Sequence, residues 1–176
     1  MARTDRDTEF TEFVASRAGW LRSVAYLLCG DWHWADDLVQ ECITKLYTHW
    51  GRASRAENLD GYARRVLVNT FLAERRSGWG RWVARLRGEP GPELDHPVEP
   101  TDLDAALDLR QALAALPPRQ RATVVLRYYC DLSVEQTAEA LDCSAGNVKS
   151  QTSRGLGALR RQLDDSLAVL PEGSAG

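Results

Sequence analysis

The side chains with the clearest chemical potential gather in one basic stretch, Ala145 to Leu163, which has four Lys or Arg residues and no Asp or Glu. Apolar residues recur in it at helical spacing and form one face. Polar and basic side chains occupy the other face, a pattern typical of a helix that packs on its own domain and reads the major groove of DNA. These side chains are Asn147, Lys149, Ser150, Ser153, Arg154 and Arg160. The alternative is an ordinary helical hairpin with a solvated basic face.

A preceding helix and a tight turn must position this face. Val134 to Leu141 is predicted to be helical, with Ser133 as its N-cap because a hydroxyl can accept a hydrogen bond from an amide of the first turn. Asp142 is expected in the left-handed conformation, which Asp tolerates better than most residues. Ser144 is then expected to cap the basic helix. The stretch therefore predicts a helix-turn-helix unit.

No pattern in the chain predicts catalysis, a cofactor or a metal site. There is no nucleophile–base arrangement and no phosphate-binding loop, and the three His residues (His33, His49 and His96) are scattered. The four Cys residues form no CxxC pair, so neither zinc nor a disulfide framework is indicated. We expect small buried thiols in a reducing compartment.

The net charge of −3 hides a strong segregation of charge along the chain. Tyr62 to Arg87 has seven Arg and one Glu, whereas Glu89 to Asp108 has seven acidic residues and no Lys or Arg. The N-terminus lacks the apolar core of a signal peptide, and no run of about 18 apolar residues could span a membrane. We therefore expect a cytoplasmic protein that does not bind membranes.

The periodicity predicts an all-α protein with two small helical domains joined by a flexible linker. The first domain, residues 1–76, has predicted helices at Thr8–Gly30, Ala35–Trp50 and Leu59–Arg76, with a polar loop at Gly51–Asn58. Residues 77–101 read as a Gly- and Pro-rich linker that can extend over roughly 80–90 Å. The second domain, residues 102–165, begins with helices at Leu103–Leu116 and Arg119–Cys130 and ends with the helix-turn-helix. Residues 166–176 are predicted to be a disordered tail.

Two strings in these domains resemble a known family. DDLVQECITKLY, from Asp36 to Tyr47, is similar to region 2.2 of bacterial sigma factors, and the segment from Leu116 to Arg160 closely resembles region 4. The short chain and the direct order of region 2, linker and region 4 are similar to an extracytoplasmic-function (ECF, group IV) sigma factor of the sigma-70 family. The Trp- and Arg-rich style resembles the sigma-E-like branch of actinobacteria.

The resemblance implies a promoter-specificity subunit that binds core RNA polymerase and recognises and melts promoter DNA. An acidic stripe would bind the clamp coiled coil of the β′ subunit, and the β flap would be a second contact. The residues implied for core polymerase are Asp36, Asp37, Leu38, Gln40 and Glu41. The residues implied for the −35 element are Ser144, Ala145, Gly146, Asn147, Lys149, Ser150, Ser153 and Arg154.

The resemblance places recognition of the −10 element in the Gly51–Asp60 loop and the helix after it, where a flipped base of the non-template strand would be held. The residues implied are Asn58, Asp60, Tyr62, Arg64, Arg65, Asn69, Arg75 and Arg76. Tyr62 could instead pack in the core, and Asn69 could be a buried structural amide. An anti-sigma factor is a further partner that the resemblance implies.

Two other functions fit the residues less well. A stand-alone helix-turn-helix regulator would need neither the acidic helix nor the long linker. A non-DNA adaptor would bind protein alone, and it would lack the steep loss of affinity with salt that a DNA binder shows. A further hypothesis concerns the acidic stretch Glu89–Asp108, whose charge resembles that of nucleic acid. It would occupy a basic channel of the polymerase until nascent RNA displaces it.

Overall fold

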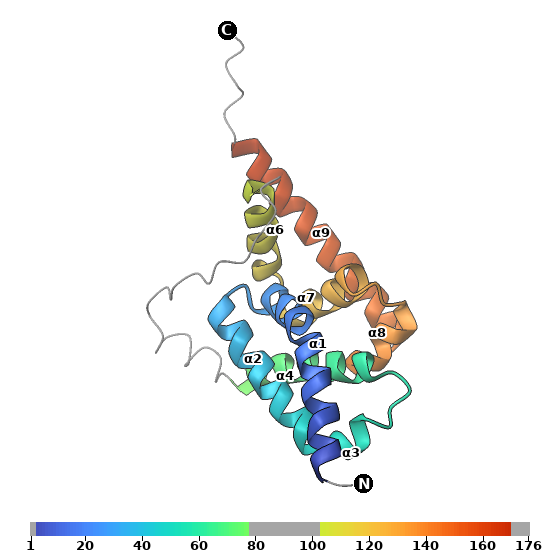
Figure 1. Cartoon of the computed structure of the whole chain (residues 1–176). Coiled ribbons are helices and arrows are strands. Elements are labelled where there is room, and N and C mark those ends of the chain that lie inside the picture. The colour runs from blue at the N-terminus through green and yellow to red at the C-terminus, as the bar shows by residue number, and fades with distance from the viewer. Residues whose placement is uncertain (1–2, 78–102, 170–176) are drawn as a thin grey trace.

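The computed structural model describes residues 3–77 and 103–169 of the chain, and these form helices joined by short turns (Figure 1). The predicted linker, apart from Ser77, and residues 170–176 lie outside the described residues. Within the described ranges every regular element is helical, which confirms the all-α prediction.

The first half contains α1 (Arg3–Cys29), α2 (Trp32–Thr48), α3 (Trp50–Ala53) and α4 (Leu59–Ser77). Gly30 ends α1 with φ of 73°, a left-handed conformation that glycine adopts without steric cost. Asp31 then caps α2, because its side chain accepts a hydrogen bond of 2.9 Å from the Trp34 amide. This cap places the start of α2 at Trp32, earlier than predicted, and α1 also starts earlier than predicted, at Arg3.

The predicted loop at Gly51–Asn58 is partly wrong, because its first residues belong to the short helix α3. Trp50 and Ala53 are buried, with exposed fractions of 3% and 0%, so tertiary packing stabilises this turn. The chain is irregular only from Ser54 to Asn58.

The second half contains α6 (Leu103–Ala115), α7 (Pro118–Val124), the π-helical turn η1 (Val125–Tyr129), α8 (Val134–Leu141) and α9 (Ala145–Val169). Pro118 begins α7, where its missing amide hydrogen costs nothing. The predicted single helix at Arg119–Cys130 widens instead into η1, which the Cys130 amide closes by donating to the Val125 carbonyl at 3.0 Å. Helix α9 continues to Val169, beyond the predicted start of the tail.

The helix-turn-helix has the predicted local structure. Ser133 and Gln136 form a capping box at the start of α8, with bonds of 3.0 and 2.9 Å between side chain and backbone. Asp142 is left-handed, with φ of 50°, and Ser144 accepts a 3.0 Å bond from the Asn147 amide. These caps and the left-handed residue define the local geometry of the turn between α8 and α9.

The two halves pack against each other in one shared core. Leu132, Ala140 and Leu141 of the second half belong to the same buried cluster as residues of α1, α2 and α4. Helix α8 lies beside the start of α4, and α6 lies along α9 (Figure 1). The domain boundaries predicted from the sequence therefore divide the chain into parts that share an interface.

Arg121 joins the halves from a buried position, with 3% of its surface exposed. It donates to the Leu28 carbonyl at 2.6 Å and to the Ala114 and Leu116 carbonyls at 2.8 and 2.9 Å. Burial lowers the pKa of Arg121 to about 10, so the guanidinium stays protonated at neutral pH. One buried cation thus holds the ends of α1 and α6 together.

The expectation of buried thiols holds for Cys29 and Cys42, whereas Cys130 and Cys143 are only partly buried. Cys29 and Cys42 are 7% and 0% exposed. Burial raises the pKa of both thiols, to about 12 for Cys42, so they stay protonated near neutral pH.

Among the described residues, no helix combines the length and the apolar character that a bilayer span requires.

Candidate nucleic-acid and polymerase interface

The polar face of α2 presents acidic and amide side chains to solvent. Asp37, Gln40 and Glu41 are exposed, and Asp36 forms an ion pair with Arg22 at 2.5 Å. Leu38, which the sequence placed with these residues, is fully buried, so its assignment to a binding surface is wrong. Its position on the apolar stripe of α2 directs it into the core.

The basic face of α9 is exposed along its first three turns. The predicted DNA-facing side chains from Ser144 to Asn147, and those of Lys149, Ser150, Ser153 and Arg154, are all exposed. Val148 is fully buried and Leu159 is 7% exposed, so the opposite face anchors the helix. The exposed face therefore carries cationic side chains and short hydrogen-bond donors side by side, which are the groups that contact base edges in a DNA groove.

Gly155 explains how closely α9 approaches α7. A Cβ atom at this position would lie 2.7 Å from Cγ2 of Val124, shorter than a van der Waals contact. Only glycine therefore fits where the two helices cross. Gly157 has open space around it, and nothing in the structure explains its choice.

A groove of about 490 Å³ lies between the end of α2, α3 and α4. Its charged side chains are all basic, and the aromatic ring of Tyr62 and the exposed amide of Asn69 complete its polar lining. The lining residues are Lys45, His49, Arg52, Tyr62, Arg65, Val66, Asn69 and Thr70. Cations for phosphates beside an aromatic ring for stacking are the components of a single-strand binding site.

The other residues predicted for the −10 element have different surroundings. Asp60 forms an ion pair with Arg17 at 2.7 Å, and the Asn58 side chain accepts a 2.9 Å bond from the Gly61 amide. The Arg64 guanidinium lies 5.0 Å from the Trp20 ring centre, and that of Arg75 lies 4.3 Å from that of Trp34. Of the remaining predicted residues, Arg65, Asn69 and Arg76 are exposed, and Tyr62 is half-buried. Asn69 is thus no buried structural amide.

The sequence did not predict Lys45, His49 and Arg52 as binding residues. They recur at intervals of four and three residues, a spacing that aligns them on one helical face. This signal was present, but the predicted loop after Trp50 interrupted it. Helix α3 begins at Trp50, after the single residue His49, and places Arg52 in the same groove.

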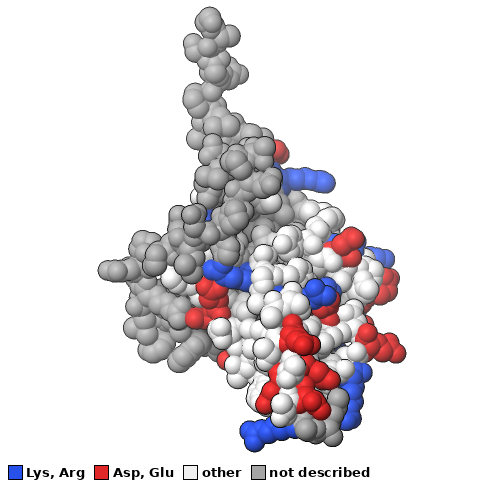
Figure 2. Space-filling model, in the orientation of Figure 1, with Lys and Arg blue, Asp and Glu red and all other residues white. Residues whose placement is uncertain are grey.

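Figure 2 shows one face of the molecule coloured by charge. Acidic side chains gather on it over the N-terminal part of α1, and acidic and basic side chains mix elsewhere. The acids of this part of α1 are Asp5, Glu9 and Glu12, which are exposed, and Asp7, which is half-buried. The basic groove and the basic face of α9 are therefore local features of a chain with a net charge of −3.

The described fold combines an exposed basic helix in a helix-turn-helix unit with a separate groove lined by basic and aromatic side chains. Residues 13–81 match the family described as Sigma-70 region 2, and residues 106–159 match Sigma-70, region 4. The RNA polymerase sigma-E factor of Streptomyces coelicolor is 38% identical over 88% of this chain and 86% of its own length. The ECF RNA polymerase sigma factor SigW of Bacillus subtilis is 26% identical over 92% of this chain and 91% of its own length.

A solved structure matches both halves together. The sigma factor RpoE of Bartonella quintana, in complex with the anti-sigma factor NepR, has a TM-score of 0.71 and 27% identity, covering 89% of this chain and 97% of that chain. CnrH, in complex with the cytosolic domain of CnrY, shares the fold with a TM-score of 0.62 at 18% identity over 90% of each chain. The chain belongs to the sigma-70 family and is an ECF sigma factor similar to the sigma-E factors. It is a transcription initiation factor that directs RNA polymerase to promoters.

Proposed function

We propose that the three surfaces divide promoter recognition among them: α2 binds core polymerase, α9 reads the −35 element, and the groove between α2, α3 and α4 holds the opened −10 strand. The observation that carries the proposal is the groove, which brings Lys45, Arg52 and Arg65 around Tyr62 with no carboxylate among its lining residues. Phosphates of a strand would pair with the cations while a base stacks on the ring.

The polymerase contact rests on Asp37, Gln40 and Glu41, which are exposed together on α2. An acidic face of this kind is complementary to a basic helical partner such as the clamp coiled coil of the β′ subunit. Two carboxylates of this face form ion pairs within the chain, Asp36 with Arg22 at 2.5 Å and Glu41 with Lys45 at 3.5 Å. The β flap remains a proposed second contact of the polymerase.

The chain acts in this proposal as a binding subunit without catalysis of its own, because the polymerase supplies the chemistry. Its place of action is the cytoplasm, where the polymerase and the DNA are. An anti-sigma factor is proposed as a further partner, supported by the similarity to RpoE, which was solved with NepR. The groove needs no cofactor to hold a strand, because its cations and ring come from the chain itself.

The groove is tested by comparing Arg52→Ala with Arg55→Ala in run-off transcription with core polymerase. Arg52 lines the groove, whereas Arg55 is an exposed arginine of the neighbouring loop that does not line it. On a duplex promoter we expect R52A to lose at least about tenfold in activity, the equivalent of one phosphate contact or stacking partner of about 1.4 kcal/mol. R55A should retain wild-type activity.

A template with a pre-opened bubble separates capture of the strand from other defects. If the groove helps to melt the −10 region, the bubble should restore part of the activity of R52A. Equal activities of R52A and R55A on the duplex promoter would refute the assignment of the groove. Loss of core binding by R52A in a pull-down would assign Arg52 to the polymerase contact instead.

A further inference from the structure

We propose that the first turns of α1, residues 3–12, position one wall of the strand groove, so that Arg52 stands beside the path of the strand. The proposal rests on the proposed function of the groove and assigns a role to side chains outside it. These residues precede residues 13–81, which match Sigma-70 region 2. The N-terminal end of α1 lies beside the end of α2 (Figure 1), where this wall begins.

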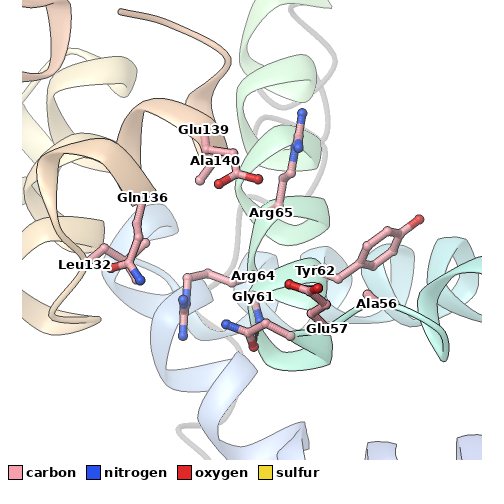
Figure 3. Close-up of a pocket in the computed structure, with 11 residues that line it drawn as sticks. Ala56, Glu57, Gly61, Tyr62, Arg64, Arg65, Leu132, Gln136, Glu139 and Ala140 are labelled. Carbon is pink, nitrogen blue, oxygen red and sulfur yellow. Dashed lines mark hydrogen bonds between the residues drawn. The ribbon is translucent and has the colours of Figure 1, made fainter. Parts of the chain in front are cut away.

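The two walls of the groove differ in how much support they have of their own. Figure 3 shows Tyr62 and Arg65 of one wall projecting from the first turns of α4, a helix of 19 residues. The other wall carries His49 and Arg52, at the junction between α2 and α3. Helix α3 has only four residues, and isolated helices shorter than about 12–15 residues are marginal in water. The second wall therefore depends on contacts from elsewhere in the chain.

Two neighbouring residues of α1, Arg6 and Asp7, supply the polar part of this support. The Arg6 guanidinium donates a hydrogen bond of 2.8 Å to the Tyr47 carbonyl in the last turn of α2, and it lies 5.5 Å from the centre of the Tyr47 ring. The Tyr47 hydroxyl donates to the Asp7 carboxylate at 3.0 Å. The dipole of α2 also favours a cation at its C-terminal end. Both the backbone and the side chain of Tyr47 are therefore held, two positions before His49.

Aromatic packing by Phe10 supplies the apolar part of the support. Its ring meets the rings of Tyr47 and Trp50 edge-on, with centroid distances of 5.0 and 5.2 Å. Trp50 is the first residue of α3 and is only 3% exposed. Because edge-to-face pairs are a preferred ring geometry, they restrict orientation as well as position. Arg6, Asp7 and Phe10 together form what we call the α1 clamp.

The α1 clamp acts on Arg52 through the residues between them. Trp50, which packs against Phe10, stands two residues before Arg52 in the same short helix. The Arg52 amide donates to the His49 carbonyl at 2.9 Å, and Nδ1 of His49 donates to the Lys45 carbonyl at 3.0 Å. A shift of this junction would move Arg52 relative to the α4 wall. A misplaced guanidinium attracts a phosphate less strongly, because the attraction between charges falls with distance.

The test compares Arg6→Ala with Arg3→Ala in the full chain. Arg3 is an exposed arginine of the preceding turn that takes no part in the α1 clamp. Both variants lose one positive charge, so general attraction to DNA falls equally. The first readouts are the affinities of the holoenzyme for −35 duplex and for a short labelled single strand with the −10 sequence of a promoter mapped by run-off transcription. The second is hydrogen exchange of the Ala53 amide in the free chain, which donates to the His49 carbonyl at 2.9 Å and reports on the order of α3.

We expect R6A to bind the single strand about three- to tenfold more weakly than R3A, because at most one phosphate contact is lost. The duplex affinities of the two variants should be equal, and the Ala53 amide should exchange faster in R6A. Arg6→Lys should restore most of the strand affinity, since an ammonium group can still donate to the Tyr47 carbonyl. Equal strand affinities of R6A and R3A would overturn the proposal. Faster exchange without weaker strand binding, or an equal loss of duplex affinity, would overturn it as well.

A double-mutant cycle shows whether Arg6 acts through Arg52. If the α1 clamp works by placing Arg52, adding R6A to R52A should change the strand affinity by less than about twofold. Additive losses would overturn the proposal, because Arg6 would then affect the strand independently of that wall. Failure of the proposed function is recognised separately, because R52A and R55A would then be equally active in run-off transcription.

Discussion

The close crossing of α7 and α9 predicts opposite effects for two glycine-to-alanine changes in one helix. At Gly155 the added Cβ would lie 2.7 Å from Cγ2 of Val124, whereas at Gly157 nothing lies within 4 Å. Alanine gains about 1 kcal/mol over glycine in a helix interior at either site. At Gly155 overpacking opposes this gain by about 1–3 kcal/mol.

Val124 cannot easily move aside, because it is only 6% exposed and a β-branched side chain in a helix has one preferred rotamer. The difference between this cost and this gain predicts that G155A lowers the free energy of unfolding by up to about 2 kcal/mol. G157A should raise it by about 0.5–1 kcal/mol. Urea titrations followed by circular dichroism measure both. Adding Val124→Ala to G155A should recover part of the loss. Stabilisation of the chain by G155A to the same degree as by G157A would refute the close crossing.

Three further predictions concern the buried Arg121, the buried thiol of Cys42 and helix α9. Arg121→Met should lower the free energy of unfolding, measured in urea, by about 2–4 kcal/mol, because three carbonyls lose a charged donor. A loss below about 1 kcal/mol would contradict the role of Arg121 in holding the two halves together. Burial raises the pKa of Cys42 to about 12 from 9.0, so above pH 9 the unfolded chain loses a proton that the native chain keeps. Stability should then fall as pH rises from about 9 toward 12, by up to about 1.4 kcal/mol per pH unit for this thiol, and Cys42→Ala should reduce that slope in urea titrations at several pH values. Lys149→Ala should weaken binding to the −35 duplex by about 1–3 kcal/mol if Lys149 reads a base, measured by fluorescence anisotropy against Arg161→Ala, an exposed change further along α9.

Local signals explain why the helix-turn-helix could be predicted in detail. The cap at Ser133, the left-handed turn at Asp142 and the cap at Ser144 each depend on residues within four positions in the sequence. The apolar spacing of Val148 and Leu159 also identified the buried face of α9 correctly. Such features are encoded nearby and need no knowledge of the partner helices.

Features that depend on distant packing were missed. Helix α3 forms because Trp50 and Ala53 are buried by tertiary contacts, although its sequence reads as a polar loop. The role of Arg121 depends on the Leu28 carbonyl, 93 residues away, which no local pattern reveals. Leu38 was assigned to a surface although its own apolar spacing placed it in the core. The groove became visible only when α3 placed Arg52 with Lys45 in one lining.

Core-dependent transcription with the full chain is the most direct test of its role as a promoter-specificity subunit. Core polymerase with and without the chain would be incubated on genomic fragments, and the start sites of the run-off transcripts sequenced. We expect discrete transcripts that require the chain, with shared −35 and −10 sequences upstream of their start sites. Identical transcripts with and without the chain, together with tight binding of the free chain to duplex DNA, would contradict this role.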